Sequence, residues 1–269
     1  MPNSGKYTLR RFAPGRLASI DVVEIGLKQH HIKALLEADV TLARELLKKR
    51  KKSGDRISMT GWLIKVIAET LKEHEEVHAF LKNKREKIVF ESIDISLMIE
   101  RRVNSERIPV ACVIRNVQDK TALQLTHEIE VLKNTPVGEK DSSLNSSPHA
   151  KLLGIYVLLP GFIRRFIWHF LLYRPKVAQK MMGSVMVTSV GMFGKTRGWF
   201  IPTSVHPVAF GLGAITLKPG IVDGQVVPRE YLYLTVLMNH DVVDGAPMAR
   251  FISKLVKNIE SGFGLEING

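Results

Sequence analysis

The sequence of 269 residues has a single cysteine, Cys112, which excludes an intrachain disulfide and a cysteine-rich metal site. Cys112 lies in the apolar, β-branched run 110–114, which favours a buried small side chain over a nucleophile. The first 16 residues carry basic side chains but lack the apolar core and cleavage site of a secretory signal. We therefore expect a cytoplasmic protein.

Several nucleotide-binding and metal-binding motifs are incomplete. Residues 191–196 end like a phosphate-binding loop, but Ser189 stands where that loop has its first glycine. The glycines at 211 and 213 continue into a strand-like run, so the third glycine of a dinucleotide fingerprint is absent. Metal-ligand spacing is missing around the histidines, among them His30, His31, His74, His78 and His127. We predict no bound metal.

Acidic residues are outnumbered, and the net charge is +13. This excess favours an anionic partner, which could be a nucleic acid, an acidic membrane surface or a phosphate-bearing substrate. Aromatic residues make up only 7% and no recognition motif accompanies the charge, so nucleic acid is the weakest of the three. We interpret the densest basic run, residues 48–52, as the solvated end of a helix.

The hydrophobic periodicity predicts helices and strands in separate blocks. Residues 32–40 fit a strand or a helix equally well, and Thr41 is a plausible hinge or cap before the next helix. The pattern predicts four helices. The first ends near residue 52, the second begins at residue 60, the third covers 121–132, and the last follows Pro247 near the end of the chain. Strands are expected from residue 87, and at 110–114, 184–190, 208–215, 226–228 and 231–238, with a loop at 134–148. This order implies an α+β fold with a mixed sheet layered under helices.

No apolar run is long enough to cross a membrane without interruption. Residues 152–173 come closest, but Pro160 and Gly161 break the run and Arg164 and Arg165 lie near its middle. Residues 161–173 instead predict an amphipathic helix. Its apolar face could contact a membrane surface or be buried against another subunit, and the sequence leaves both alternatives open.

His240 and Asp244 form the one pair that suits acid–base chemistry. His240 closes a predicted strand, and Asp244 follows four residues later at the start of the last helix. A histidine accepts a thiol proton near neutral pH, and a nearby carboxylate can orient its ring. The alternative is that Asp244 only caps the helix and His240 is an ordinary residue at a strand end. From these residues alone, the alternative is favoured.

Several sequence segments, which follow one another in the order of a known family, favour the catalytic interpretation of His240 and Asp244 over the helix-cap alternative. The chain resembles the catalytic core of the dihydrolipoyl acyltransferases of 2-oxo acid dehydrogenase complexes, which share the chloramphenicol acetyltransferase fold. The resemblance covers residues 32–260 and rests on the segments 36–41 (LEADVT), 57–66 (ISMTGWLIKV), 93–99 (IDISLMI), 108–116 (IPVACVIRN), 188–194 (TSVGMFG), 211–215 (GLGAI) and 239–251 (NHDVVDGAPMARF).

The resemblance implies a chloramphenicol acetyltransferase-like mixed sheet covered by helices, assembled as a homotrimer. It implies that His240 deprotonates a thiol and that Thr188, from a different subunit, hydrogen-bonds the tetrahedral oxyanion. Asp244 would form a salt bridge that holds the histidine region, with Arg16 and Lys28 as candidate partners. Coenzyme A or acyl-CoA would be the cosubstrate, with no cofactor bound, and a lipoyl group on another protein could carry the acyl group.

Three departures from the family pattern accompany the resemblance. Asn239 and Asp241 flank the histidine where the family has aspartate and arginine. An apolar insertion at about 152–180 replaces a shorter polar connector, so we expect an N-terminal segment at 1–30 and an acyltransferase catalytic domain at 31–269. We also expect a free-standing domain, because the chain has no room for a lipoyl or subunit-binding domain. The alternative function is a non-catalytic trimeric scaffold or interaction protein of the same fold.

Overall fold

The computed structural model describes residues 5, 7–9, 12, 15–103, 106–135, 155–156, 158–189 and 197–266. Most of the predicted loop at 134–148, Val190 and the incomplete phosphate-loop motif lie outside these residues. The elements in chain order are α1 (Gly15–Gly26), β1 (His31–Asp39), α2 (Thr41–Lys52), α3 (Met59–Lys72), η1 (Glu75–His78), β2 (Phe80–Asn83), β3 (Glu86–Ile88), β4 (Ile95–Val103), β5 (Glu106–Ile114), η2 (Val117–Asp119), α4 (Ala122–Asn134), α6 (Gly161–Leu172), α7 (Pro175–Met182), β6 (Val185–Ser189), β7 (Val208–Val222), β8 (Gln225–Asn239) and α8 (Gly245–Glu260).

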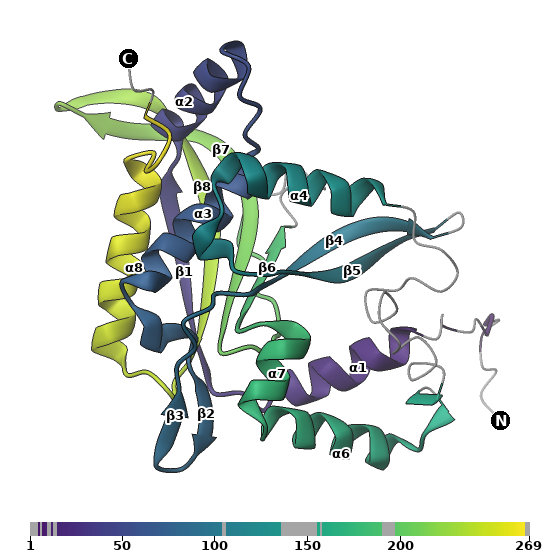
Figure 1. Cartoon of the computed structure of the whole chain (residues 1–269). Helices are drawn as coiled ribbons and strands as arrows, with labels where there is room; N and C mark the ends of the chain where they lie inside the picture. The colour runs from purple at the N-terminus through teal and green to yellow at the C-terminus, as the bar shows by residue number, and fades with distance from the viewer. Residues whose placement is uncertain are drawn as a thin grey trace.

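A six-stranded sheet with the order β1-β8-β7-β6-β4-β5 forms the centre of the molecule (Figure 1). Strand β6 is parallel to both of its neighbours, β4 and β7. The other pairs in this sheet are antiparallel. The predicted α+β fold with a mixed sheet covered by helices is therefore confirmed.

Helices α3, α4 and α8 lie along one face of this sheet (Figure 1). Side chains from alternate strand positions, such as Val187 and Phe210, and from the inner faces of the helices, such as Trp62 and Phe251, form one continuous buried core. Trp62 also donates its indole N–H to the carbonyl of Phe263 at 2.9 Å, which ties α3 to the end of the chain. The rigid core thus fixes where each strand ends.

The longest strand pair differs from its prediction. Residues 226–228 and 231–238 were expected as separate strands, but they belong to the single strand β8. Pro228 stands opposite Pro219 in the arm formed by β7 and β8, which projects from the body as a two-stranded ribbon (Figure 1). A proline is tolerated there because its missing N–H can face the unpaired side of a ribbon. The ambiguous segment 32–40 is strand β1, because its residues pair in register with β8.

The predicted amphipathic helix at 161–173 is α6, and it packs beside α1 and α7. Asp21 of α1 is 1% exposed. Its carboxylate accepts hydrogen bonds from the Tyr156 hydroxyl at 2.6 Å and from Arg164 Nε at 2.7 Å. Trp168 donates to the same Tyr156 hydroxyl at 2.9 Å. These bonds fix α6 against the N-terminal helix. Among the described residues, no helix is long and apolar enough to cross a bilayer.

Changing Asp21 to asparagine should lower the free energy of unfolding by about 3 kcal/mol at neutral pH, because a buried ion pair loses one partner. Burial raises the pKa of Asp21, but the hydrogen bonds from Arg164 and Tyr156 outweigh it and hold that pKa below its ordinary value. The stabilisation is therefore present above the unfolded pKa of about 4 and is lost as the pH falls through the folded pKa.

Urea denaturation of the wild type and Asp21→Asn across that pH range measures this effect. The matched control is Glu24→Gln on the same helix, which removes a surface pair with Arg165 at 3.7 Å and should cost less than about 0.5 kcal/mol. An Asp21→Asn deficit that stays constant down to pH values well below 4 would contradict the assignment.

Candidate active site

His240 directly follows β8 and is exposed. Its backbone N–H donates to the carbonyl of His30 at 2.9 Å, which extends the β1–β8 pairing by one bond. The neighbouring Asn239 is 7% exposed and uses both ends of its amide. Its Nδ2 donates to Gln29 Oε1 at 3.2 Å, and its Oδ1 accepts from the Asp241 backbone N–H at 2.9 Å. An asparagine at this position therefore holds the turn that presents the His240 ring.

The Asp241 side chain contacts His30, the residue that directly precedes β1. Its two carboxylate oxygens lie 2.9 and 3.0 Å from His30 Nδ1. The family pattern has an arginine at this position. The structure adds a local role, in which Asp241 joins the His240 turn to the residue that precedes β1.

Two further histidines at this end of the sheet serve the structure. His206 donates from Nε2 to the Met182 carbonyl at 3.1 Å, and its Nδ1 lies 3.1 Å from the Ser204 hydroxyl. Burial lowers the pKa of His206 to about 4, so the ring is neutral at physiological pH. His31 donates from Nε2 to the His206 carbonyl at 2.9 Å, and burial lowers its pKa as well. Both ring nitrogens of His206 and Nε2 of His31 are engaged in these bonds, whereas the His240 ring has no hydrogen-bond partner in the described part of the chain.

Asp244 occupies the N-cap position of α8 and is exposed. Asp244 therefore stands at the cap of the last helix, as the alternative held, although its side chain makes no capping hydrogen bond. Within the described residues of this single chain, Asp244 has no bond to His240 and no ion pair with Arg16 or Lys28. Its carboxylate still lies at the helix N-terminus, where the helix dipole favours negative charge. An anchoring role for Asp244 stays a prediction.

Thr188 lies near the end of β6 and is half-buried. It pairs with Met98 of β4 and Gly211 of β7. The strand is preceded by Gly183 at a φ of +74°, where a Cβ atom would lie 2.3 Å from the Asp94 carbonyl oxygen. Only glycine fits this close approach, so Gly183 sets the entry of the chain into β6 and with it the position of Thr188.

Thr188 and His240 do not meet within one chain. Gly211, the partner of Thr188, stands opposite Thr235, five residues before His240 on β8. Two strand spacings across the sheet and five residues along it correspond to roughly 19 Å. The two predicted catalytic residues therefore lie at different ends of the sheet.

A cavity of about 780 Å³ opens at the Thr188 end of the sheet. It is bounded by the second half of α2, the start of α3, the outer part of α4 and the ends of the central strands. Ser189 lines it, whereas strand alternation directs Thr188 to the opposite face. The cavity has the size that drug-sized ligands and cofactors occupy.

This cavity is lined by an excess of positive charge. One acidic residue, Glu130, is accompanied by five basic ones, namely Arg44, Lys48, Lys51, Arg56 and Lys133. Arg44 is paired with Glu230 at 2.6 Å. The other four have no ion-pair partner among the described residues, so they attract an anion. Residues 48–52 form the basic end of α2 with exposed lysines, as the sequence predicted. That Lys48 and Lys51 also line this cavity depends on the tertiary structure, which brings α2 over the strand ends.

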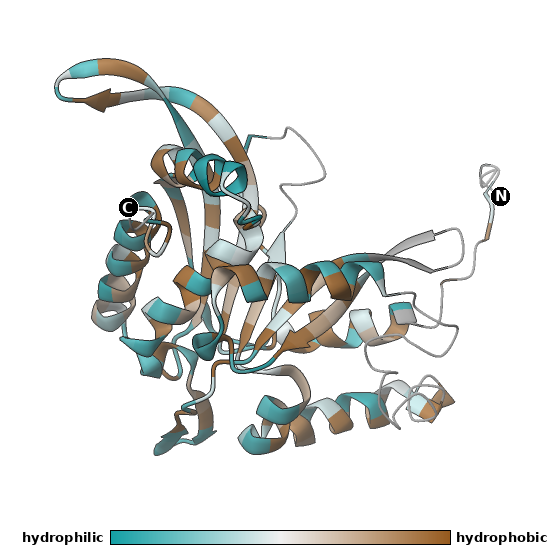
Figure 2. Cartoon of the chain, turned by 45° about the horizontal axis from the view of Figure 1, so that its top comes forward, coloured by the Kyte–Doolittle hydropathy of each residue, from teal (hydrophilic) through white to brown (hydrophobic). Residues whose placement is uncertain are grey.

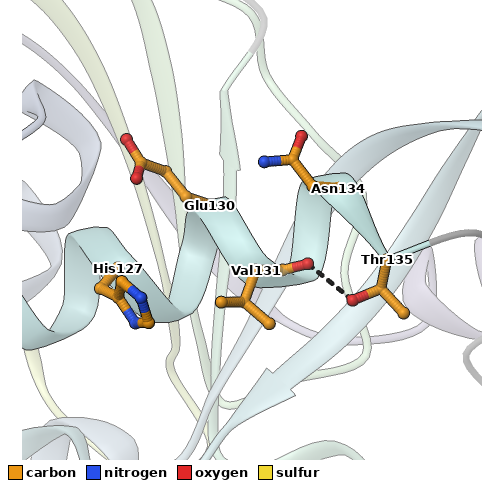
Figure 3. Close-up of a pocket in the computed structure, with 5 residues that line it drawn as sticks. All are labelled: His127, Glu130, Val131, Asn134 and Thr135. Atoms are coloured by element: carbon orange, nitrogen blue, oxygen red, sulfur yellow. Dashed lines mark hydrogen bonds between the residues drawn. The ribbon is translucent and has the colours of Figure 1, made fainter.

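A second, open hollow on the outer turns of α4 offers no comparable chemistry. It is lined by His127, Glu130, Val131, Asn134 and Thr135, and in Figure 3 the His127 ring and the Glu130 carboxylate point to opposite sides of the helix. The Thr135 hydroxyl donates to the Val131 carbonyl at 2.7 Å and only closes the helix. Among the described residues, no group of three histidine, cysteine or acidic side chains could hold a metal ion.

Comparison with known proteins identifies the class. The family described as 2-oxoacid dehydrogenases acyltransferase (catalytic domain) matches residues 27–141 and 175–264. The chain therefore belongs to this family of acyltransferase domains, as the resemblance predicted. The family match leaves residues 142–174 unmatched, and this gap overlaps the segment that the sequence identified as an insertion.

Among curated relatives, the chain is 22% identical over 213 residues to the dihydrolipoyllysine-residue succinyltransferase component of the 2-oxoglutarate dehydrogenase complex of Buchnera aphidicola, covering 79% of this chain and 41% of that protein. It is 24% identical over 239 residues to the dihydrolipoyllysine-residue acetyltransferase component of the pyruvate dehydrogenase complex of Corynebacterium glutamicum, covering 84% and 30%. The chain thus spans less than half the length of these relatives.

Solved structures support the same fold. The dihydrolipoamide acetyltransferase of Azotobacter vinelandii superposes with a TM-score of 0.69 at 19% identity, covering 98% of this chain and 96% of that one. The cubic core of a pyruvate dehydrogenase multienzyme complex superposes with a TM-score of 0.66 at 19% identity and the same coverage. At these identities the likeness establishes the fold alone.

Proposed function

We propose that this protein is a coenzyme A-dependent acyltransferase that works as a homotrimer, with residues 31–269 as its catalytic domain and an insertion at about 152–180. The observation that carries the proposal is the exposed imidazole of His240 after the end of β8, without a partner among the described residues, in a chain of this family. The names of its relatives suggest a dihydrolipoyl group on another protein as the acyl acceptor or donor. We propose a cytoplasmic location.

The positions of the predicted residues support this function. The Azotobacter vinelandii enzyme is reported with roles for a serine, a histidine and an asparagine in its catalytic mechanism. Its serine lies 52 positions before the histidine and its asparagine four positions after, and Thr188 and Asp244 have the same offsets from His240. A threonine retains the hydroxyl, whereas Asp244 offers a carboxylate in place of an amide.

The separation of Thr188 from His240 supports a site that two subunits share. A hydroxyl roughly 19 Å away cannot donate to an oxyanion formed next to His240. In a trimer, His240 of one subunit can meet Thr188 of the next.

The reaction then proceeds by thiol-to-thioester exchange. His240 accepts the proton of the attacking thiol, and the thiolate sulfur forms a bond to the carbonyl carbon of the thioester. The Thr188 hydroxyl donates to the resulting oxyanion. The carbonyl re-forms, the original carbon–sulfur bond breaks, and the departing thiolate takes the proton from His240. The neutral base is regenerated, and the step serves both directions of transfer.

The basic cavity beside the end of β6 is the site that we propose for the phosphates of coenzyme A. Changing Lys48 and Lys51 together to glutamate should weaken coenzyme A binding at least about tenfold, because charge-assisted hydrogen bonds to phosphate are lost. Titration calorimetry measures the Kd, and steady-state kinetics should show a raised KM with little change in kcat.

The matched control is the double change of Lys49 and Lys52 to glutamate. These lysines are exposed neighbours on the same helix that do not line the cavity, so the net charge changes equally. The control should leave the Kd within about twofold. Equal weakening by both pairs would mean that general charge attraction, and not this cavity, binds coenzyme A.

The changes next to the histidine favour a second candidate function, a non-catalytic trimeric scaffold. Asn239 and Asp241 replace the family's residues, and Asp241 is engaged with His30. A purified protein that forms trimers by light scattering, gives no heat with coenzyme A and releases no thiol from acetyl-CoA or succinyl-CoA with dihydrolipoamide would support the scaffold. Thiol release above the uncatalysed rate would exclude it.

A further inference from the structure

Helix α6 presents aromatic side chains to solvent. Phe162, Phe166 and Phe170 follow each other at four-residue steps, Tyr173 comes three residues later, and these four side chains are 67%, 69%, 48% and 73% exposed. At 3.6 residues per turn they form one stripe along the outer face of the helix. Val177 and Met181 of α7 are also exposed, at 41% and 48%. In Figure 2 brown, apolar segments recur along α6, which lies at the edge of the molecule.

Helix α6 has apolar side chains on both sides: Leu171 is buried against the protein, whereas an ordinary surface helix has a polar outer face. Its inner side carries Arg164, whose guanidinium is paired with the buried Asp21, and Trp168, which donates to the Tyr156 hydroxyl. Burial raises the pKa of Tyr156 to about 12, so this hydroxyl stays protonated and donates to Asp21. Turning the aromatic stripe inward would break these bonds. The exposure of the stripe is therefore fixed by specific contacts.

The segment of chain that carries this stripe has no acidic residue of its own. Residues 142–222 contain no aspartate or glutamate and nine lysines and arginines. Four of these, Arg165, Arg174, Lys176 and Lys180, are exposed on α6, on α7 and between them. The Arg174 guanidinium stacks over the Phe170 ring, with its Cζ atom 4.1 Å from the ring centroid. Arg165 has an acidic neighbour, Glu24, at 3.7 Å.

We propose that the outer face of α6 and α7 docks on an anionic lipid surface. Aromatic rings enter the boundary between headgroups and acyl chains, and arginines and lysines around them contact the lipid phosphates. A two-fold contact between two copies of this face fits less well, because it would bring the four cations against their own copies with no acidic residue from 142–222 to offset them. A heterologous contact inside the proposed trimer is the alternative that the oligomeric state tests below.

Co-sedimentation of the full chain with vesicles tests the proposal. The protein should partition onto vesicles of equal parts phosphatidylcholine and phosphatidylglycerol, should do so less with added salt, and should stay in solution with phosphatidylcholine alone. The double change of Phe166 and Phe170 to serine should weaken partitioning roughly a hundredfold. Changing Lys176 and Lys180 to glutamate should weaken it about tenfold or more.

Matched controls come from other parts of the surface. Leu217 and Ile221 on the β7–β8 arm are 64% and 79% exposed, and changing both to serine should leave partitioning unchanged. The Lys49 and Lys52 double change to glutamate alters the net charge equally and should reduce binding far less than the Lys176 and Lys180 pair. Absence of partitioning, or equal binding to both kinds of vesicle, would overturn the proposal. A smaller oligomer for Phe166→Ser with Phe170→Ser would overturn it too, because the stripe would then lie between subunits.

Discussion

Replacing His240 with alanine should lower kcat for acyl transfer by at least about a thousandfold, because the proposed general base for the thiol proton is lost. Both ring nitrogens of His206 and Nε2 of His31 are hydrogen-bonded, and burial lowers the pKa of both rings, which makes them weaker bases. The measurement is the rate of thiol release from acetyl-CoA or succinyl-CoA with dihydrolipoamide as acceptor. The KM should change little, because the imidazole acts on the proton and not on the coenzyme.

The control for this variant is His30→Ala, since His30 is also exposed and adjoins the same turn. It removes the contact to Asp241 but leaves the His240 ring, so kcat should fall by no more than about tenfold. Both variants must keep the oligomeric state and the far-ultraviolet spectrum of the wild type. A His240→Ala protein with wild-type turnover would refute the assignment of the base.

Mixing two inactive variants should restore activity, and this is the strongest test of a shared site. His240→Ala and Thr188→Ala each remove one half of every active site. In trimers assembled at random from equal amounts of both, about one interface in four combines an intact His240 with an intact Thr188. Refolding or co-expressing the two together should therefore return about a quarter of wild-type activity, against roughly a hundredfold loss or more for Thr188→Ala alone.

The alternative geometry predicts a different result. If both residues acted within one chain, the mixture would have only the mean activity of the two variants. Ser189→Ala serves as the comparison, because Ser189 lines the basic cavity and is the neighbouring hydroxyl. If Ser189→Ala rather than Thr188→Ala abolishes turnover and is rescued by mixing, the oxyanion donor is Ser189.

Periodicity and turn residues predicted most of the fold, because each of those signals is local. The helices at α3, α4, α6 and α8 and the strands β4 to β7 follow patterns that a few neighbouring residues define. Strand β8 was divided wrongly, because Pro228 is a break signal in isolation and is tolerated only through its place in a ribbon opposite Pro219. The segment 32–40 could be assigned only from its partner strand.

Contacts between residues that are distant in the sequence could not be predicted from local patterns. His240 was predictable from its place after a strand and from the family blocks. The roles of Lys48 and Lys51 arise because α2 is packed over strand ends more than a hundred residues away in the chain. The pair of Asp21 and Arg164 joins residues separated by 143 positions, and no local pattern indicates it.

The N-terminal helix α1 and the residues that follow it connect α6 with the turn that carries His240. Asp21 holds α6 from below, and α1 ends at Gly26, only four residues before His30. The carbonyl of His30 fixes the backbone of His240, and its ring holds Asp241. The short stretch from Asp21 to His30 therefore makes contacts both with the outward aromatic helix and with the turn that carries His240.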